Sequence, residues 1–172
     1  RDPNCFFIHY SKMYNTFMPK NKILSFILFF IITFSASFIG GAVSINLKEP
    51  WYSTLIKSSL NPPDWVFAPV WTILYLMMTI AVWNFWHSKN RDMNTVYIYF
   101  IHIIINTTWS IVFFALHKIF LAMLVLITLI IFIFLLIIRF KSVNKLSYYL
   151  MIPYLLWCFY ALFLNINLVI LN

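Results

Sequence analysis

The most restrictive feature of this sequence is the distribution of its charged residues, which are confined to short segments. Of 172 residues, only 12 are Lys or Arg and 4 are Asp or Glu. A helix needs about 20 predominantly apolar residues to cross the hydrocarbon core of a bilayer. Five stretches are at least that long and carry no charged residue: 23–47, 65–88, 93–117, 119–138 and 146–172. The charge pattern therefore predicts five membrane spans.

The spans are expected to be helices, because backbone groups in lipid must find their hydrogen bonds within the segment. Strands of a membrane barrel would alternate polar and apolar residues over about ten positions, and these stretches do not alternate. We therefore predict an all-α fold, an integral membrane bundle of five transmembrane helices. Residues 1–22 form a polar, basic N-terminal tail, and residues 23–172 form the five-helix membrane domain.

The first span has a second interpretation. Lys20 and Lys22, an apolar run and the small residues at 35–37 resemble a cleavable signal peptide. The apolar character continues to Leu47, which is further than a signal peptide requires and favours a retained span.

Orientation follows from the Lys and Arg residues outside the spans. The tail and the second and fourth connections carry nine of them, whereas the first and third connections carry three. The positive-inside rule places the N-terminus in the cytoplasm and the C-terminus outside, in a bacterial cell membrane or, as the alternative, an organelle membrane. This topology explains the net charge of +8. We therefore expect the lipid bilayer as a partner and expect no binding to nucleic acid.

Several kinds of chemistry are absent from the spans. A proton relay, a coupled transporter or a carboxylate-based hydrolase needs ionisable groups at membrane depth, and the spans contain no Asp, Glu, Lys or Arg. The four histidines are too scattered for a metal site. Gly40 and Gly41 are the only glycines, so no phosphate-binding loop exists. We expect no metal, no cofactor and no conventional enzyme.

The first span and the connection after it carry local signals. Ala36, Gly40 and Ser44 recur every four residues, a spacing that allows close helix–helix contact, most simply within one chain. In the connection, residues 51–56 suggest a short interfacial helix with Trp51, Tyr52, Leu55 and Ile56 on one face.

Two residues bear on how the second span begins. Asp64 is a candidate N-cap. Pro69 removes a backbone hydrogen bond one turn inside the span, which predicts an irregular start there. Irregular backbone at membrane depth is tolerated only beside protein or a cavity, so this irregularity indicates a site.

Three spans carry aromatic and polar residues at helical spacing. The polar members His102 and Asn106 should face the bundle interior, together with the residues on their faces. Such faces would enclose a large apolar pocket with a few polar groups, suited to a planar aromatic or sterol-like ligand. Interhelical packing, with Asn106 as a hydrogen-bonding residue, explains the same spacing equally well. The three sets are Trp71, Tyr75 and Met78; His102, Asn106 and Trp109; and Pro153, Trp157, Ala161 and Leu164.

The sequence resembles the tryptophan-rich sensory protein / translocator protein family, also called the peripheral-type benzodiazepine receptor family, over roughly residues 23–170. The resemblance rests on three stretches, in the first connection with the second span, the third span and the fifth span. They are Trp51-Tyr52 with Leu55, Lys57, Asn61-Pro62-Pro63, Phe67, Pro69-Val70-Trp71 and Leu74-Tyr75; Asn106 with Trp109; and Pro153-Tyr154-Leu155, Trp157, Ala161 and Leu164-Asn165.

The resemblance implies a five-helix bundle, often a homodimer, that binds porphyrins, sterols and benzodiazepine-type drugs between its helices under the first connection. We therefore expect a porphyrin-binding receptor or translocator that acts in tetrapyrrole sensing or transport. Carried over by position, the ligand-binding residues are Tyr52, Trp71, Tyr75, Asn106, Trp157 and Ala161, with His102 where relatives often carry an amide. Trp109 and Leu164 join them from the helical spacing.

Two alternatives follow from the same resemblance. Some bacterial members are associated with light-dependent porphyrin breakdown, in which case Trp71 and Trp157 would be catalytic. A sterol carrier is the second alternative, but the sequence after Asn165 lacks the Tyr and basic residue of the family's sterol-recognition segment. The chain also departs from its relatives at Val125, where an Asp is common, and at Ser58, where a Pro is common.

Overall fold

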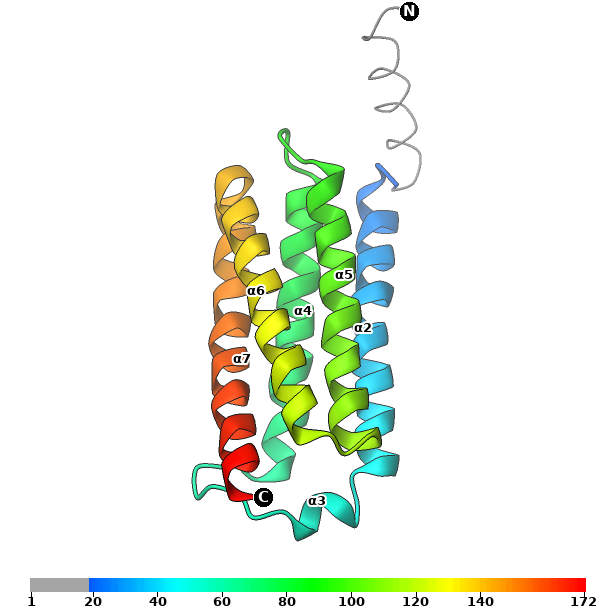
Figure 1. Cartoon of the computed structure of the whole chain (residues 1–172). Coiled ribbons are helices and arrows are strands. Elements are labelled where there is room, and N and C mark those ends of the chain that lie inside the picture. Colours follow the sequence, from blue (N-terminus) through cyan, green and yellow to red (C-terminus); the bar gives the residue numbers. More distant parts are fainter. Residues whose placement is uncertain (1–18) are drawn as a thin grey trace, which may run out of the picture.

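The computed structural model describes residues 19–172, so residues 1–18 of the predicted tail lie outside the described part. Its five long helices are apolar enough to cross a membrane, which confirms the five predicted spans (Figure 1). No residue between 19 and 172 is in a strand, so the all-α prediction is also confirmed. The long helices are α2 (Lys22–Leu47), α4 (Phe67–Trp86), α5 (Met93–Ser110), α6 (Ile119–Val143) and α7 (Lys145–Leu171).

Three of these helices begin at a polar residue that immediately precedes the apolar stretch. The side chains of Asn21, Asp92 and Asn144 each accept a hydrogen bond from a backbone N–H in the first turn of α2, α5 and α7. Such caps satisfy N–H groups that have no partner inside the helix. The cap residues therefore set where these three spans start.

The second span begins differently. A 3₁₀ turn over Asp64–Val66 precedes α4, which confirms the irregular start predicted from Pro69. The predicted N-cap at Asp64 is wrong, because Pro63 occupies the cap position and no side chain caps the turn. The Asp64 carboxylate instead accepts a hydrogen bond from Lys48 at the end of α2.

The first connection contains the short helix α3 (Trp51–Thr54), which is shorter than the predicted interfacial helix. Leu55 is already extended and Ile56 is exposed, so these two residues do not continue the predicted face. Tyr52 is buried. In Figure 1, α3 and the C-terminus lie at the same end of the bundle, opposite the start of α2.

The five spans form a closed ring of neighbours. Helix α2 packs against α4 and α5, α4 packs against α7, and α6 packs against α5 and α7. The end near the start of α2, which we call the packed half, is filled by large side chains that are almost completely buried. They include Phe29, Trp86, Tyr99, Phe140 and Met151. The other end, beside α3, is not filled in this way.

Candidate functional site

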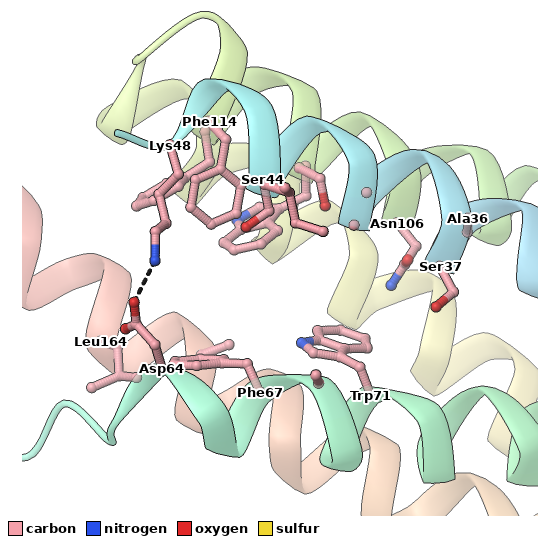
Figure 2. A pocket seen from close by; sticks show the side chains of 18 of the residues that line it. Ala36, Ser37, Ser44, Lys48, Asp64, Phe67, Trp71, Asn106, Phe114 and Leu164 are labelled. Atoms are coloured by element: carbon pink, nitrogen blue, oxygen red, sulfur yellow. Dashed lines mark hydrogen bonds and ion pairs between the residues drawn. The ribbon is translucent and has the colours of Figure 1, made fainter. Parts of the chain in front are cut away.

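The end of the bundle beside α3 contains a cavity of about 400 Å³ (Figure 2), and we call this end the cavity half. That volume lies within the range of about 300–1,000 Å³ typical of small-molecule sites. Its walls come from four long helices, while Tyr52, Asn61 and Asp64 of the first connection line its mouth. The lining includes Ala36, Gly40, Gly41 and Ser44 of α2, with Lys48 directly after it; Phe67, Trp71 and Tyr75 of α4; Asn106 and Trp109 of α5; and Trp157, Ala161, Leu164 and Asn165 of α7.

The small residues of α2 serve two purposes. A Cβ atom at Gly40 would lie 2.8 Å from Ser110 Oγ, so the glycine allows α2 to approach α5 closely. This contact confirms the predicted close approach within one chain. At Gly41 a Cβ atom would meet nothing within 4 Å. The neighbouring glycine therefore leaves space where α2 lines the cavity.

Three tryptophans from three different helices line the cavity. The ring of Trp71 stacks on Tyr75 with centroids 5.4 Å apart. Trp109 stacks on Phe113 with centroids 5.2 Å apart and the planes 16° from parallel. Trp157 is half-buried on α7. Stacked neighbours restrict the rotamers of the first two indoles, so the wall presents flat apolar surfaces in fixed orientations.

A hydrogen-bond network closes the deep end of the cavity. The Tyr75 hydroxyl donates to Asn106 Oδ1 at 2.7 Å, and Asn106 Nδ2 donates to the Tyr154 hydroxyl at 3.0 Å. His102 Nε2 lies 3.0 Å from the same hydroxyl, and its side chain is fully buried. His102 and Asn106 thus face the interior, as predicted. Tyr154 joins them, although the spacing argument overlooked it.

Some polar atoms on the cavity wall have no hydrogen-bond partner in residues 19–172. These are the indole N–H groups of Trp109 and Trp157 and both amide atoms of Asn165. Asn165 is only 2% exposed. Leaving a buried donor or acceptor unpaired costs about 1–3 kcal/mol, so native structures contain few such groups. A bound ligand with matching polar atoms would recover this cost.

The mouth of the cavity carries opposite charges. Lys48 Nζ donates to the Asp64 carboxylate, and the pair joins the end of α2 to the turn before α4 (Figure 2). Partial burial disfavours the Lys48 ammonium, but the hydrogen bond and charge of Asp64 outweigh that effect and raise the pKa of Lys48. The Tyr52 ring lies beside both Lys48 and Lys57, whose Nζ atoms are 5.2 and 4.2 Å from its centroid.

The structure brings most of the predicted site residues together. Eight of the nine predicted ligand-binding residues line the cavity: Tyr52, Trp71, Tyr75, Asn106, Trp109, Trp157, Ala161 and Leu164. His102 is not on the wall and instead contacts the Tyr154 hydroxyl. The predicted inward face of α7 is wrong at Pro153, which is exposed because the buried centre of that helix runs through Tyr154 and Cys158. Contact of these residues with a ligand stays a prediction.

Lys48, Asp64 and Asn165 line the cavity but were not among the predicted ligand-binding residues. Lys48 and Asp64 are separated by the first connection, and only their opposite charges at its two ends hinted at a pair. Asn165 had a clearer signal, because an amide in an otherwise apolar span is costly unless it faces the interior. It directly follows Leu164, which was predicted.

Comparison with known proteins agrees with the family resemblance of the sequence. A family model described as the TspO/MBR family matches residues 26–171. The match begins in α2 and ends at the last residue of α7, so it includes all five spans.

Individual relatives match over nearly the whole chain. "Tryptophan-rich protein TspO" of Chlorobaculum tepidum is 34% identical over 89% of this chain and 99% of its own length. "Protein CrtK" of Rhodobacter capsulatus is 31% identical over 87% of this chain and 95% of its own length. "Tryptophan-rich sensory protein" of Cereibacter sphaeroides is 30% identical over 82% of this chain and 90% of its own length.

Proposed function

The chain belongs to the TspO/MBR family and is an integral, multi-pass membrane protein, and we propose that its cavity binds porphyrins and related flat, largely apolar ligands. The observation that carries this proposal is the cavity wall itself. Indoles from α4, α5 and α7 line a space of about 400 Å³, and two of them have buried N–H groups without a partner. The proposed role is a receptor or translocator in tetrapyrrole sensing or transport.

Stacking and burial supply the affinity in this proposal. A planar ring system that lies against Trp71, Trp109 or Trp157 removes apolar surface from water at about 25 cal/mol per Å². Stacking on an aromatic side chain adds about 0.5–1.5 kcal/mol. Nitrogen or oxygen acceptors on the ligand would pair with the free indole N–H groups and fix its orientation.

The name of one relative, a tryptophan-rich sensory protein, supports a sensory role for this chain as well. A sensor needs a ligand-dependent change but no covalent chemistry. The cavity wall fits that requirement, because its only charged residues among positions 19–172 are Lys48 and Asp64 at the mouth.

Protoporphyrin titration in the dark tests the proposal. We expect protoporphyrin to quench tryptophan fluorescence, and Trp71→Ala to weaken binding about a hundredfold, since truncating a packed Trp costs about 3 kcal/mol. The matched control is Trp65→Ala, because Trp65 is 73% exposed and does not line the cavity. Wild-type affinity in both Trp71→Ala and Trp157→Ala would contradict the proposed binding site and show that the indoles are packing residues.

We further propose that the cavity half faces the outside of a bacterial cell, with the N-terminus in the cytoplasm. The uneven distribution of Lys and Arg supports this orientation. Single cysteines at the exposed positions Ser59 and Ser142 test it in a background without Cys5 and Cys158. We expect an impermeant thiol reagent to label Ser59→Cys from outside intact cells. Labelling of Ser142→Cys alone would show that the orientation is the opposite one.

A further inference from the structure

The ion pair at the cavity mouth has two unequal members. Lys48 and Asp64 both line the cavity, one from the end of α2 and the other from the turn before α4 (Figure 2). The Lys48 side chain is 20% exposed, whereas that of Asp64 is 60% exposed. Glu49 lies 3.7 Å from Lys48 and is 50% exposed. The cation is therefore the less exposed member, and its carboxylate partners are the more solvated ones.

Because the two side chains differ in exposure, another carboxylate can replace Asp64 beside Lys48 at little cost. An ion pair with an exposed member contributes about 0–1 kcal/mol, so opening it costs little. Asp64 keeps its access to water when the pair opens. Lys48 has less access to water, since its stem lies against the cavity wall and its ammonium remains beside the Tyr52 ring. A carboxylate that replaces Asp64 at Lys48 therefore keeps the less exposed charge paired and releases the more solvated one.

We propose that Lys48 recognises a carboxylate on the ligand and that this carboxylate takes the place of Asp64. The ligand class is then an amphiphilic organic acid with a flat apolar ring system and an acidic side chain at one end. The acid lies at the mouth, while the ring lies deeper against Trp71 and its neighbours. Lys48 thus determines specificity. The inference rests on the proposed binding function.

Lys57 provides a matched control for Lys48. Its Nζ lies 4.2 Å from the Tyr52 centroid, on the same ring that Lys48 approaches, yet Lys57 does not line the cavity. Removing either charge changes the net charge of the same region by one unit. Only the loss of Lys48 should change the affinity of the cavity for a ligand that carries a carboxylate.

The experiment compares protoporphyrin with its dimethyl ester, which has the same ring and no ionisable acid. Both are titrated in the dark into nanodiscs of uncharged phosphatidylcholine, and the ratio of their affinities is recorded for each variant. Because all variants share one lipid, the different partitioning of the two porphyrins cancels when ratios are compared. We expect Lys48→Gln to reduce the preference for the diacid about fivefold and to leave ester binding unchanged.

Two further variants sharpen the result. We expect Lys57→Gln to keep the wild-type ratio, and Asp64→Asn to raise the affinity for the diacid because the competing carboxylate is gone. Unchanged ester binding in Lys48→Gln reports that the fold is intact. An unchanged ratio in Lys48→Gln overturns the inference and leaves the proposed function standing. Failure of both porphyrins to quench the unmodified protein overturns the proposed function itself.

Discussion

The two halves of the bundle use the same kinds of side chain in different ways. In the packed half, the indole N–H groups of Trp83 and Trp86 donate to the backbone carbonyls of Lys22 and Pro19, each at 3.0 Å. In the cavity half, the buried indole N–H groups of Trp109 and Trp157 have no partner in residues 19–172. A high tryptophan content therefore does not by itself indicate a site, whereas indole donors without a partner beside a cavity support the proposed one.

The hydroxyl and amide groups follow the same division. Thr33 Oγ1 and the Tyr99 hydroxyl are 2.6 Å apart, and both side chains are fully buried in the packed half. Asn165 is equally buried in the cavity half, yet its amide is unpaired. Among the buried side-chain atoms of residues 19–172, one other lacks a partner, His102 Nδ1, and His102 does not line the cavity. Under the proposed function, the packed half supplies stability and the cavity half supplies ligand recognition.

The largest expected effect is a separation of stability from binding. Trp86 is 2% exposed, so Trp86→Ala should lower the free energy of unfolding by about 3–5 kcal/mol. Trp157→Ala only enlarges an existing cavity, so it should lower the free energy of unfolding much less. It should nevertheless remove most of the affinity for porphyrin. Thermal unfolding in detergent, paired with porphyrin titration, measures both effects. Equal destabilisation by the two substitutions would erase the distinction between the halves.

A second pair of substitutions should change stability in opposite directions. Thr33→Val keeps the shape of the side chain but leaves the buried Tyr99 hydroxyl without its partner, which should cost about 1–3 kcal/mol. Asn165→Leu removes an amide that has no partner, so stability should stay constant or rise by about 1 kcal/mol. Porphyrin affinity should fall about tenfold in Asn165→Leu alone. A loss of stability in Asn165→Leu as large as in Thr33→Val would show that its amide is paired in the folded protein.

A smaller effect distinguishes a binding protein from a light-dependent enzyme. Trp71→Phe and Trp157→Phe keep most of the ring area, so we expect each to weaken dark binding only by about threefold to tenfold. Under illumination, absorption spectra of bound porphyrin should fade at one common rate in the wild type and both variants. Faster loss of the porphyrin band in the wild type, with none of that excess in the Phe variants, would instead make these indoles catalytic.

The sequence predicted the spans well because the bilayer imposes a strict physical requirement. An uncharged stretch of 20 or more residues has few alternatives to a membrane helix, and each of α2, α4, α5, α6 and α7 overlaps one such stretch, with α6 continuing past it through Arg139 and Lys141. The irregular start at Asp64–Val66 was predictable for a similar reason, because Pro69 cannot donate a backbone hydrogen bond.

The details of the site were less predictable, since helical spacing defines a face only to within the width of a side chain. His102 and Asn106 lie on one face of α5, but of the two only Asn106 lines the cavity, whereas His102 contacts Tyr154 of α7. Pro153 was placed on the wrong side of α7 for the same reason. The pairing of Lys48 with Asp64 depends on how the first connection folds back, which no local pattern specifies.

The indole N–H resonances test the central claim most directly. The chain has 7 tryptophans, and single Trp→Phe variants can assign their ¹⁵N–¹H signals in nanodiscs. If the unpaired donors of the cavity half contact the ligand, protoporphyrin should shift the Trp109 and Trp157 signals strongly. The Trp83 and Trp86 signals should stay in place, because their N–H groups are already bonded to backbone carbonyls. Saturating porphyrin that leaves Trp109 and Trp157 unchanged, or shifts all four signals equally, would contradict the assignment of recognition to the cavity half.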